Sequence, residues 1–350
     1  MKTRRRFTSL WTASVGVLLL SPFAWAQRPM PAVVPSSSFQ INISPVTGVP
    51  QSVVDAFNAA AALWKPYIAN NMTVNIEVAY PALGLTGQLG KTTNVEYPTN
   101  YTDIRAALYA DAGIESDDFI LLNLPATNAF TIVKPTAFSP LTTTTDNVAG
   151  MYVTGANAKA VGLLSGSNLA IDAYIDFNSS YNANYDFDGN PDGTHYDFIT
   201  LAAHEIGHAL GFITNVDYFD ASQFSTYAYP LDLFRFADNT VTTGTFATKE
   251  RNLVPGTVAY FDDSEFEYSM STGTVAHGGD GAGAGHWKDG LAIGLMDPTL
   301  PIGIAYGPNS ADLRALDLIG YNIDFSPVPE ISTLSTGLLL AGGLLRRRRS

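Results

Sequence analysis

The chain has 350 residues and no cysteine, and its 32 acidic residues outnumber its 19 basic ones. Disulfides, thiolate metal sites and cysteine nucleophiles are therefore excluded. Residues 27–326 hold 31 of the acidic residues but 11 of the basic ones, a net charge of −20 with histidine neutral, so we expect this part to avoid nucleic acid and anionic lipid surfaces.

Residues 1–26 resemble a secretory signal peptide. A basic start is followed by an apolar stretch and by Ala24-Trp25-Ala26, a typical cleavage site. A membrane anchor is the alternative, but the apolar stretch is short and Pro22 interrupts it. Residues 27–38 are rich in proline and serine and are predicted to form a linker.

Residues 39–212 are predicted to form an N-terminal catalytic subdomain in which strands and helices alternate. Alternating apolar residues predict strands, and apolar residues at helical spacing predict helices. The expected strands lie at 39–43, 72–79 and 170–177, and the expected helices at 53–68 and 102–110. This order predicts an α+β fold, with a twisted sheet backed by helices.

An acidic loop precedes the most informative part of the chain. Asp186, Asp188, Asn190 and Asp192 place oxygen side chains at alternate positions, which could wrap Ca²⁺. However, Pro191 stands where a calcium loop of the EF-hand type has glycine, and no glutamate follows at the twelfth position. A solvated turn is therefore the preferred interpretation, and calcium is the alternative.

The segment His204-Glu205-Ile206-Gly207-His208 carries the chemistry. Histidines four residues apart lie one helical turn apart on one face, so both imidazoles can bind one metal ion. Glu205 lies between them and can reach a water on that metal. This pattern is typical of zinc peptidases, in which the glutamate is the general base. Histidines that only make hydrogen bonds are the alternative, but ligands and base occur together here.

The residues around this segment predict where its helix begins and ends. Thr194 and Asp197 fit a capping box, with Thr194 as the N-cap, and Gly211 is a plausible end of the helix. His195 would then lie in the first turn, nine residues before His204. We expect His195 to face the surface or to lie behind the metal ligands.

The residues alone offer several candidates for the third metal ligand. A catalytic zinc usually has three protein ligands and one open position for water. Residues 213–325 are predicted to form a C-terminal subdomain of loops and short elements, with a helix at 310–319. We prefer His286 as the third ligand. The alternatives are His277 and the carboxylates Asp217, Asp220, Glu265 and Glu267.

Gly285-His286-Trp287 is followed, ten residues after the histidine, by Met296 in a Leu-Met-Asp-Pro segment. Together with the His-Glu helix, this arrangement resembles leishmanolysin-like metzincins over residues 197–320. The compact spacing of other metzincins fails, because Thr214 stands where their third histidine falls. The resemblance implies a metzincin-like fold with an irregular C-terminal subdomain. It also implies zinc ligands His204, His208 and His286, the base Glu205, and a methionine turn at Met296. Eukaryotic members are rich in disulfides, so the scaffolding of residues 213–285 is in question.

Residues 326–350 resemble a PEP-CTERM sorting signal of Gram-negative bacteria. A Val-Pro-Glu segment precedes an apolar run over residues 331–345, and Arg346–Arg349 follow. Ile331 departs from the usual pattern, which has a second proline there. The resemblance implies an exosortase-type processing enzyme as a partner and a location in the cell envelope, at the cell surface or outside the cell. A simple C-terminal membrane anchor is the alternative.

Taken together, the sequence predicts an exported zinc-dependent endopeptidase of metzincin type. Its substrate would be a protein or peptide, hydrolysed by a metal-activated water with Glu205 as the general base. One alternative is a non-catalytic surface or matrix protein on the same scaffold. Another is a zinc hydrolase that acts on a non-peptide amide or ester.

Export is expected to remove both ends of the chain. Mass spectrometry of the exported protein should find an N-terminus near Gln27 and should not find Arg346–Arg349, because both terminal segments carry processing signals. A mature species that keeps the four arginines would show that the C-terminal tail is an ordinary anchor.

Overall fold

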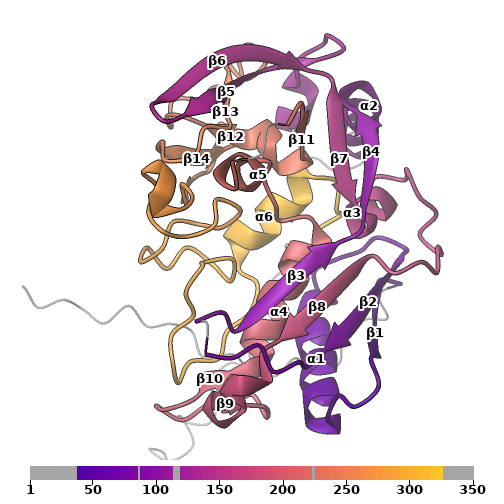
Figure 1. Ribbon diagram of the computed structural model, residues 1–350. Helices are drawn as coiled ribbons and strands as arrows, with labels where there is room; N and C mark the ends of the chain where they lie inside the picture. The colour runs from indigo at the N-terminus through magenta and orange to yellow at the C-terminus, as the bar shows by residue number, and fades with distance from the viewer. Residues whose placement is uncertain (1–37, 86, 113–118, 223–224, 326–350) are drawn as a thin grey trace, which may run out of the picture.

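The computed structural model describes residues 38–85, 87–112, 119–222 and 225–325. The expected signal peptide, all but the last residue of the linker, and the sorting tail lie outside these ranges. The described residues form a mixed α+β fold, as the sequence predicts (Figure 1). Within them, no helix has the length and apolar character needed to cross a membrane.

The largest sheet has four strands in the order β1-β2-β8-β3. β1 (Gln40–Pro45), β2 (Thr73–Ala79) and β8 (Ala173–Phe177) are parallel, and they match the predicted strands to within three residues at every end. β3 (Gly90–Asn94) runs antiparallel to β8 and forms one edge of the sheet. The sequence analysis did not identify β3, because its residues have no apolar alternation.

Two helices pack against each other beside this sheet. α1 (Gln51–Trp64) is rich in alanine and buries Phe57 and Trp64 completely, and α4 (Phe198–Leu210) carries His204, Glu205 and His208. The indole Nε1 of Trp64 donates to the carbonyl oxygen of Ala203 at 3.1 Å. Because this contact lies between two buried helices, it fixes α4 against α1.

The remaining strands of the described residues belong to four further sheets, one with two strands and three with three strands each. Strands of residues 213–325 pair with strands of residues 39–212, so the two parts interlock: β11 with β7, and β13 with β5. The strands are β4 (Glu96–Asn100), β5 (Phe130–Phe138), β6 (Leu141–Val148), β7 (Gly150–Thr154), β9 (Tyr185–Asp186), β10 (Tyr196–Asp197), β11 (Tyr227–Ala228), β12 (Arg235–Phe236), β13 (Arg251–Asn252), β14 (Ala259–Asp262) and β15 (Glu267–Met270). The helices are α2 (Tyr101–Ala112), α3 (Gly155–Ala160), α5 (Val216–Asp220) and α6 (Ser310–Leu318), with 3₁₀ turns at Phe119–Asn123, Ser179–Asn184, Pro230–Phe234 and Val275–His277.

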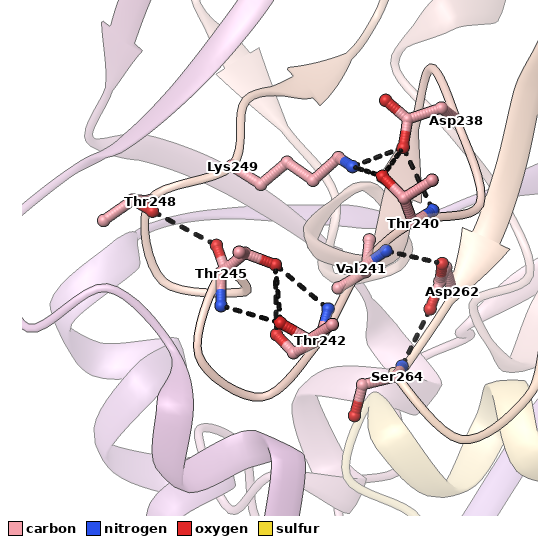
Figure 2. A network of polar contacts seen from close by, with 9 residues as sticks. All are labelled: Asp238, Thr240, Val241, Thr242, Thr245, Thr248, Lys249, Asp262 and Ser264. Atoms are coloured by element: carbon pink, nitrogen blue, oxygen red, sulfur yellow. Dashed lines mark hydrogen bonds and ion pairs between the residues drawn. The ribbon is translucent and has the colours of Figure 1, made fainter.

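Polar contacts hold the loop between β12 and β13 (Figure 2). The ammonium of Lys249 contacts the carboxylate of Asp238 and donates to the Thr240 hydroxyl at 2.8 Å. The amide of Val241 donates to the carboxylate of Asp262, on β14, at 3.3 Å. These contacts order a loop that has little regular secondary structure.

A buried ion pair connects α3 to the main sheet. The Lys159 Nζ lies 2.6 Å from the Asp172 Oδ2, and both side chains are almost completely buried. Lys159 also donates to the carbonyl of Thr73, and Asp172 also accepts from the amide of Asn75 at 2.7 Å. Each of the two charged groups therefore has a main-chain partner in addition to the ion pair.

Lys159→Met is expected to destabilise the fold by about 3–5 kcal/mol, because it leaves the Asp172 carboxylate buried without a cation. The double variant Lys159→Met/Asp172→Asn should recover much of this loss. Lys134→Met, which removes a more exposed ion pair with Asp146, is the matched control and should cost less than about 1 kcal/mol. Urea unfolding measures all three, and equal losses in the two single variants would contradict the assigned role of the buried pair.

Candidate metal centre

The three predicted zinc ligands meet at one point, although 78 residues separate His208 from His286. The Nε2 atom of His204 lies 3.2 Å from that of His208 and 3.2 Å from that of His286, and the third side of the triangle is 3.1 Å. Two nitrogens bound to one tetrahedral zinc at about 2.05 Å lie about 3.3 Å apart. The spacing of the imidazoles therefore fits zinc. Within the described ranges, these three histidines are the only group of three or more histidine or acidic side chains that lie close enough together to hold one metal ion.

Main-chain carbonyls determine which ring nitrogens face the centre of this triangle. The Nδ1 atoms of His204, His208 and His286 lie 2.7, 2.7 and 3.0 Å from the carbonyl oxygens of Leu295, Phe212 and Gly283. A carbonyl only accepts, so each Nδ1 carries the hydrogen and each Nε2 keeps a lone pair. Three lone pairs that face one another cannot hydrogen-bond among themselves, whereas a cation between them satisfies all three.

Burial keeps these imidazoles neutral. It lowers the pKa of His204 to about 3, and the neighbouring His286 contributes to this shift. Burial also lowers the pKa of His208 well below its usual value, and it lowers that of His286. Neutral imidazole is the form that binds a metal, so protons do not compete for the site near neutral pH.

Glu205 lies next to the histidine triangle and against β3. The Thr92 hydroxyl lies 2.7 Å from the Glu205 Oε2 and 2.9 Å from its main-chain oxygen. Gly90 faces the other carboxylate oxygen so closely that a Cβ there would lie 2.9 Å from Oε1. Burial raises the pKa of Glu205 to about 7, and the bond from Thr92 opposes this shift. A cation at the histidines would favour the ionised carboxylate.

The histidines and Glu205 line an open cleft with a volume of about 520 Å³. Residues of β3 and residues 298–300, just after the methionine turn, also line it. Further lining residues are Gly87, Gln88, Leu89, Phe177, Tyr196, Leu201, Ile213 and Asp217. The metal centre is thus accessible to a molecule from outside.

Met296 lies under the helical turn that connects the two ligand histidines. It is fully buried, and a Cβ at Gly207 would lie 2.3 Å from its Sδ. Only glycine at position 207 allows this approach. The glycine between Glu205 and His208 is therefore explained by the packing of the methionine turn.

Asp312 organises the methionine turn, a role that the sequence analysis missed. Its buried carboxylate accepts from the amides of Leu295 and Met296 at 2.8 and 3.1 Å, and from the indole Nε1 of Trp287 at 2.8 Å. One carboxylate thus joins the turn to the residue after His286. The only signal in the sequence was a capping box that begins at Asn309, and that indicates no more than a helix start.

Two alternative third ligands are bound elsewhere. The Nδ1 of His277 lies 2.8 Å from the Asp220 Oδ1, and Asp220 also accepts from the hydroxyl of Thr274 at 2.9 Å. These three residues connect α5 to the glycine-rich loop. Neither His277 nor Asp220 belongs to the group of potential metal ligands.

The other carboxylates are also absent from that group. Asp217 accepts from the amides of Ala284 and Gly285 at 2.7 and 3.1 Å, so it holds the loop that presents His286. Glu265 and Glu267 are exposed. Asp217 therefore contributes to the centre by positioning a ligand.

The predicted start of the metal-binding helix was wrong. α4 begins at Phe198 with Asp197 as its N-cap, and the Asp197 Oδ2 accepts from the amide of Thr200 at 3.0 Å. A carboxylate at that position is itself a strong cap, so the helix starts three residues later than expected. Thr194 and His195 lie before the helix and contact the Asp192 Oδ1 instead. The predicted end at Gly211, which has a φ of 120°, is confirmed.

The acidic loop folds mainly onto its own backbone. Asp186 and Asp188 accept from the amides of Asp188 and Asn190, each at 3.0 Å. Asp192 accepts from the amide of Thr194 at 2.8 Å. Asp188, Asn190 and Asp192 are exposed. The four predicted calcium residues do not form a group of converging carboxylates.

Comparisons of the chain with protein families, with curated proteins and with solved structures found no match.

His286→Ala is expected to reduce zinc affinity by more than about 100-fold, because two imidazoles on one helix leave the site open. His277→Ala should leave zinc affinity nearly unchanged, since His277 contacts Asp220. Zinc titration against a competing chelator measures both variants. Loss of zinc in His277→Ala together with its retention in His286→Ala would contradict the ligand set.

Proposed function

We propose that this protein is an exported zinc endopeptidase of metzincin type, similar to leishmanolysin-like enzymes. The observation that carries the proposal is the convergence of three imidazole lone pairs beside Glu205 in an open cleft. The signal-like residues 1–26 and the sorting-like tail support export. They also support processing by an exosortase-type enzyme.

His204, His208 and His286 would hold the zinc ion. Zinc bound there would polarise a water molecule and the scissile carbonyl group. The Glu205 carboxylate takes a proton from the attacking water and delivers it to the leaving amine. Thr92 orients that carboxylate through its bond to Oε2, so the second oxygen, Oε1, remains available for the proton.

The position of β3 favours a peptide over a small amide or ester. β3 is an edge strand of the main sheet, and its residues also line the cleft. The edge of a sheet offers a row of main-chain donors and acceptors to an extended chain. A peptide paired with β3 would lie along the cleft with its main chain near Glu205. A small ester would use little of this edge.

A non-catalytic role on the same scaffold explains less of the site. A protein that only binds zinc or a surface does not need a carboxylate at position 205, and it does not need a hydroxyl that orients it. Glu205 is instead half-buried beside the proposed metal ligands, and its removal from solvent raises its pKa. Such shifted groups gather at catalytic sites.

Glu205→Gln is expected to reduce hydrolysis of casein by roughly 100-fold or more while zinc remains bound, because glutamine cannot accept the proton. Glu265→Gln, an exposed acidic residue outside the cleft, is the matched control and should keep full activity. Normal turnover by zinc-loaded Glu205→Gln would refute the mechanism. Cleavage of an ester but not of casein by the unmodified protein would support the non-peptide hydrolase instead. Cleavage of neither would support the non-catalytic protein.

A further inference from the structure

Two aspartates lie side by side at the N-terminal end of α4. β9 and β10 pair in parallel, with Asp186 opposite Asp197 and Tyr185 opposite Tyr196. Partners in register project from the same face of a sheet, so the two carboxylates point the same way. Figure 1 shows this short ladder at the lower end of α4.

Asp197 has a buried oxygen without a partner. The residue is 3% exposed, and its Oδ2 accepts from the amide and the hydroxyl of Thr200. The Asp197 Oδ1 is buried and reaches no donor with hydrogen-bond geometry. Burial raises the pKa of this carboxyl group, the bonds from Thr200 and the nearby amide of Ile199 oppose the shift, and the negative charge of Asp186 adds to it.

No lysine or arginine neutralises this pair. Among the described residues, the ion pairs include neither Asp186 nor Asp197. An unpartnered buried carboxylate oxygen costs free energy unless a donor or a cation satisfies it. Two adjacent carboxylates, one of them with such an oxygen, favour a divalent cation.

We propose that Asp186 and Asp197 bind a calcium ion. Calcium accepts six to eight oxygen ligands in irregular geometry, so carbonyl oxygens of the loop and water molecules can complete the shell around two carboxylates. This ligand set differs from the one predicted from sequence alternation. Asn190 and Asp192 are exposed, and the Asp192 carboxylate accepts from the amide of Thr194. The proposed set contains Asp197 instead, which lies outside the alternating run.

The ion would connect the acidic loop to the start of α4. The loop already contacts this helix: the rings of Phe187 and Phe198 lie 4.9 Å apart, and a Cβ at Gly189 would lie 3.1 Å from Ile199 Cδ1. Calcium would add a link from Asp186 to the N-cap residue Asp197. The site is separate from the histidine triangle, so the inference does not depend on the proposed peptidase activity.

The test measures calcium binding by the full-length, zinc-loaded chain. Terbium, an oxygen-seeking substitute for calcium, should show luminescence sensitised by Tyr185 and Tyr196, and calcium should displace it. Calcium at about 100 times its Kd should raise the Tm by roughly 5 °C or more. Asp186→Asn and Asp197→Asn should lose both responses. Asparagine is also a good N-cap, so Asp197→Asn should still fold.

Asp192→Asn is the matched control, since it removes an exposed charge from the same loop, and it should keep both responses. Three results would overturn the proposal: no response in the unmodified protein, retained responses in both Asp186→Asn and Asp197→Asn, or loss in Asp192→Asn. An equal response to magnesium would overturn the assignment to calcium. Removal of zinc with a chelator that spares calcium should leave the terbium signal intact.

Discussion

The histidine triangle depends on three main-chain carbonyls that hold the imidazole rings. Each carbonyl comes from a different segment: Leu295 from the methionine turn, Phe212 from the end of α4, and Gly283 from the glycine-rich loop. If one of them moved, its ring would rotate and its Nε2 lone pair would leave the centre. The fold must therefore place three distant stretches of backbone around a single helix.

Charged side chains hold these stretches of backbone in place, in a chain that has no cysteine. Asp217 holds the amides of Ala284 and Gly285, and Arg235 donates to the carbonyl of Ala284 at 3.1 Å, so both act just before His286. Asp312 fixes the methionine turn in the same way. A charged group removed from water raises the free energy of the fold unless hydrogen bonds compensate it. A conformation that breaks those hydrogen bonds is therefore strongly disfavoured. These side chains thus fix the backbone around His286 and Met296 through directional hydrogen bonds.

The sequence predicts the parts of this site that depend on local spacing. His204, Glu205 and His208 share a helical turn, and the apolar face of that helix is buried as expected. His286 and Met296 were found through a family resemblance, since no local rule joins residues so far apart. Thr92 was not predicted, because its strand, Gly90–Asn94, has no apolar alternation. The helix start was misplaced because two residues could each form the cap.

α4 is fixed at several points along its length, and this determines how the site can work. Trp64 binds the carbonyl of Ala203, and the buried Tyr321 hydroxyl donates to the Leu210 carbonyl at 2.6 Å. The last carbonyls of a helix have no partner within it, so Tyr321 stabilises the end of α4. Asp197 caps the other end. A helix held in this way keeps its ligands in place when a metal or substrate enters, so little binding energy is lost in rearrangement. In the proposed mechanism the Glu205 carboxylate, which lines the cleft beside these fixed histidines, transfers the proton.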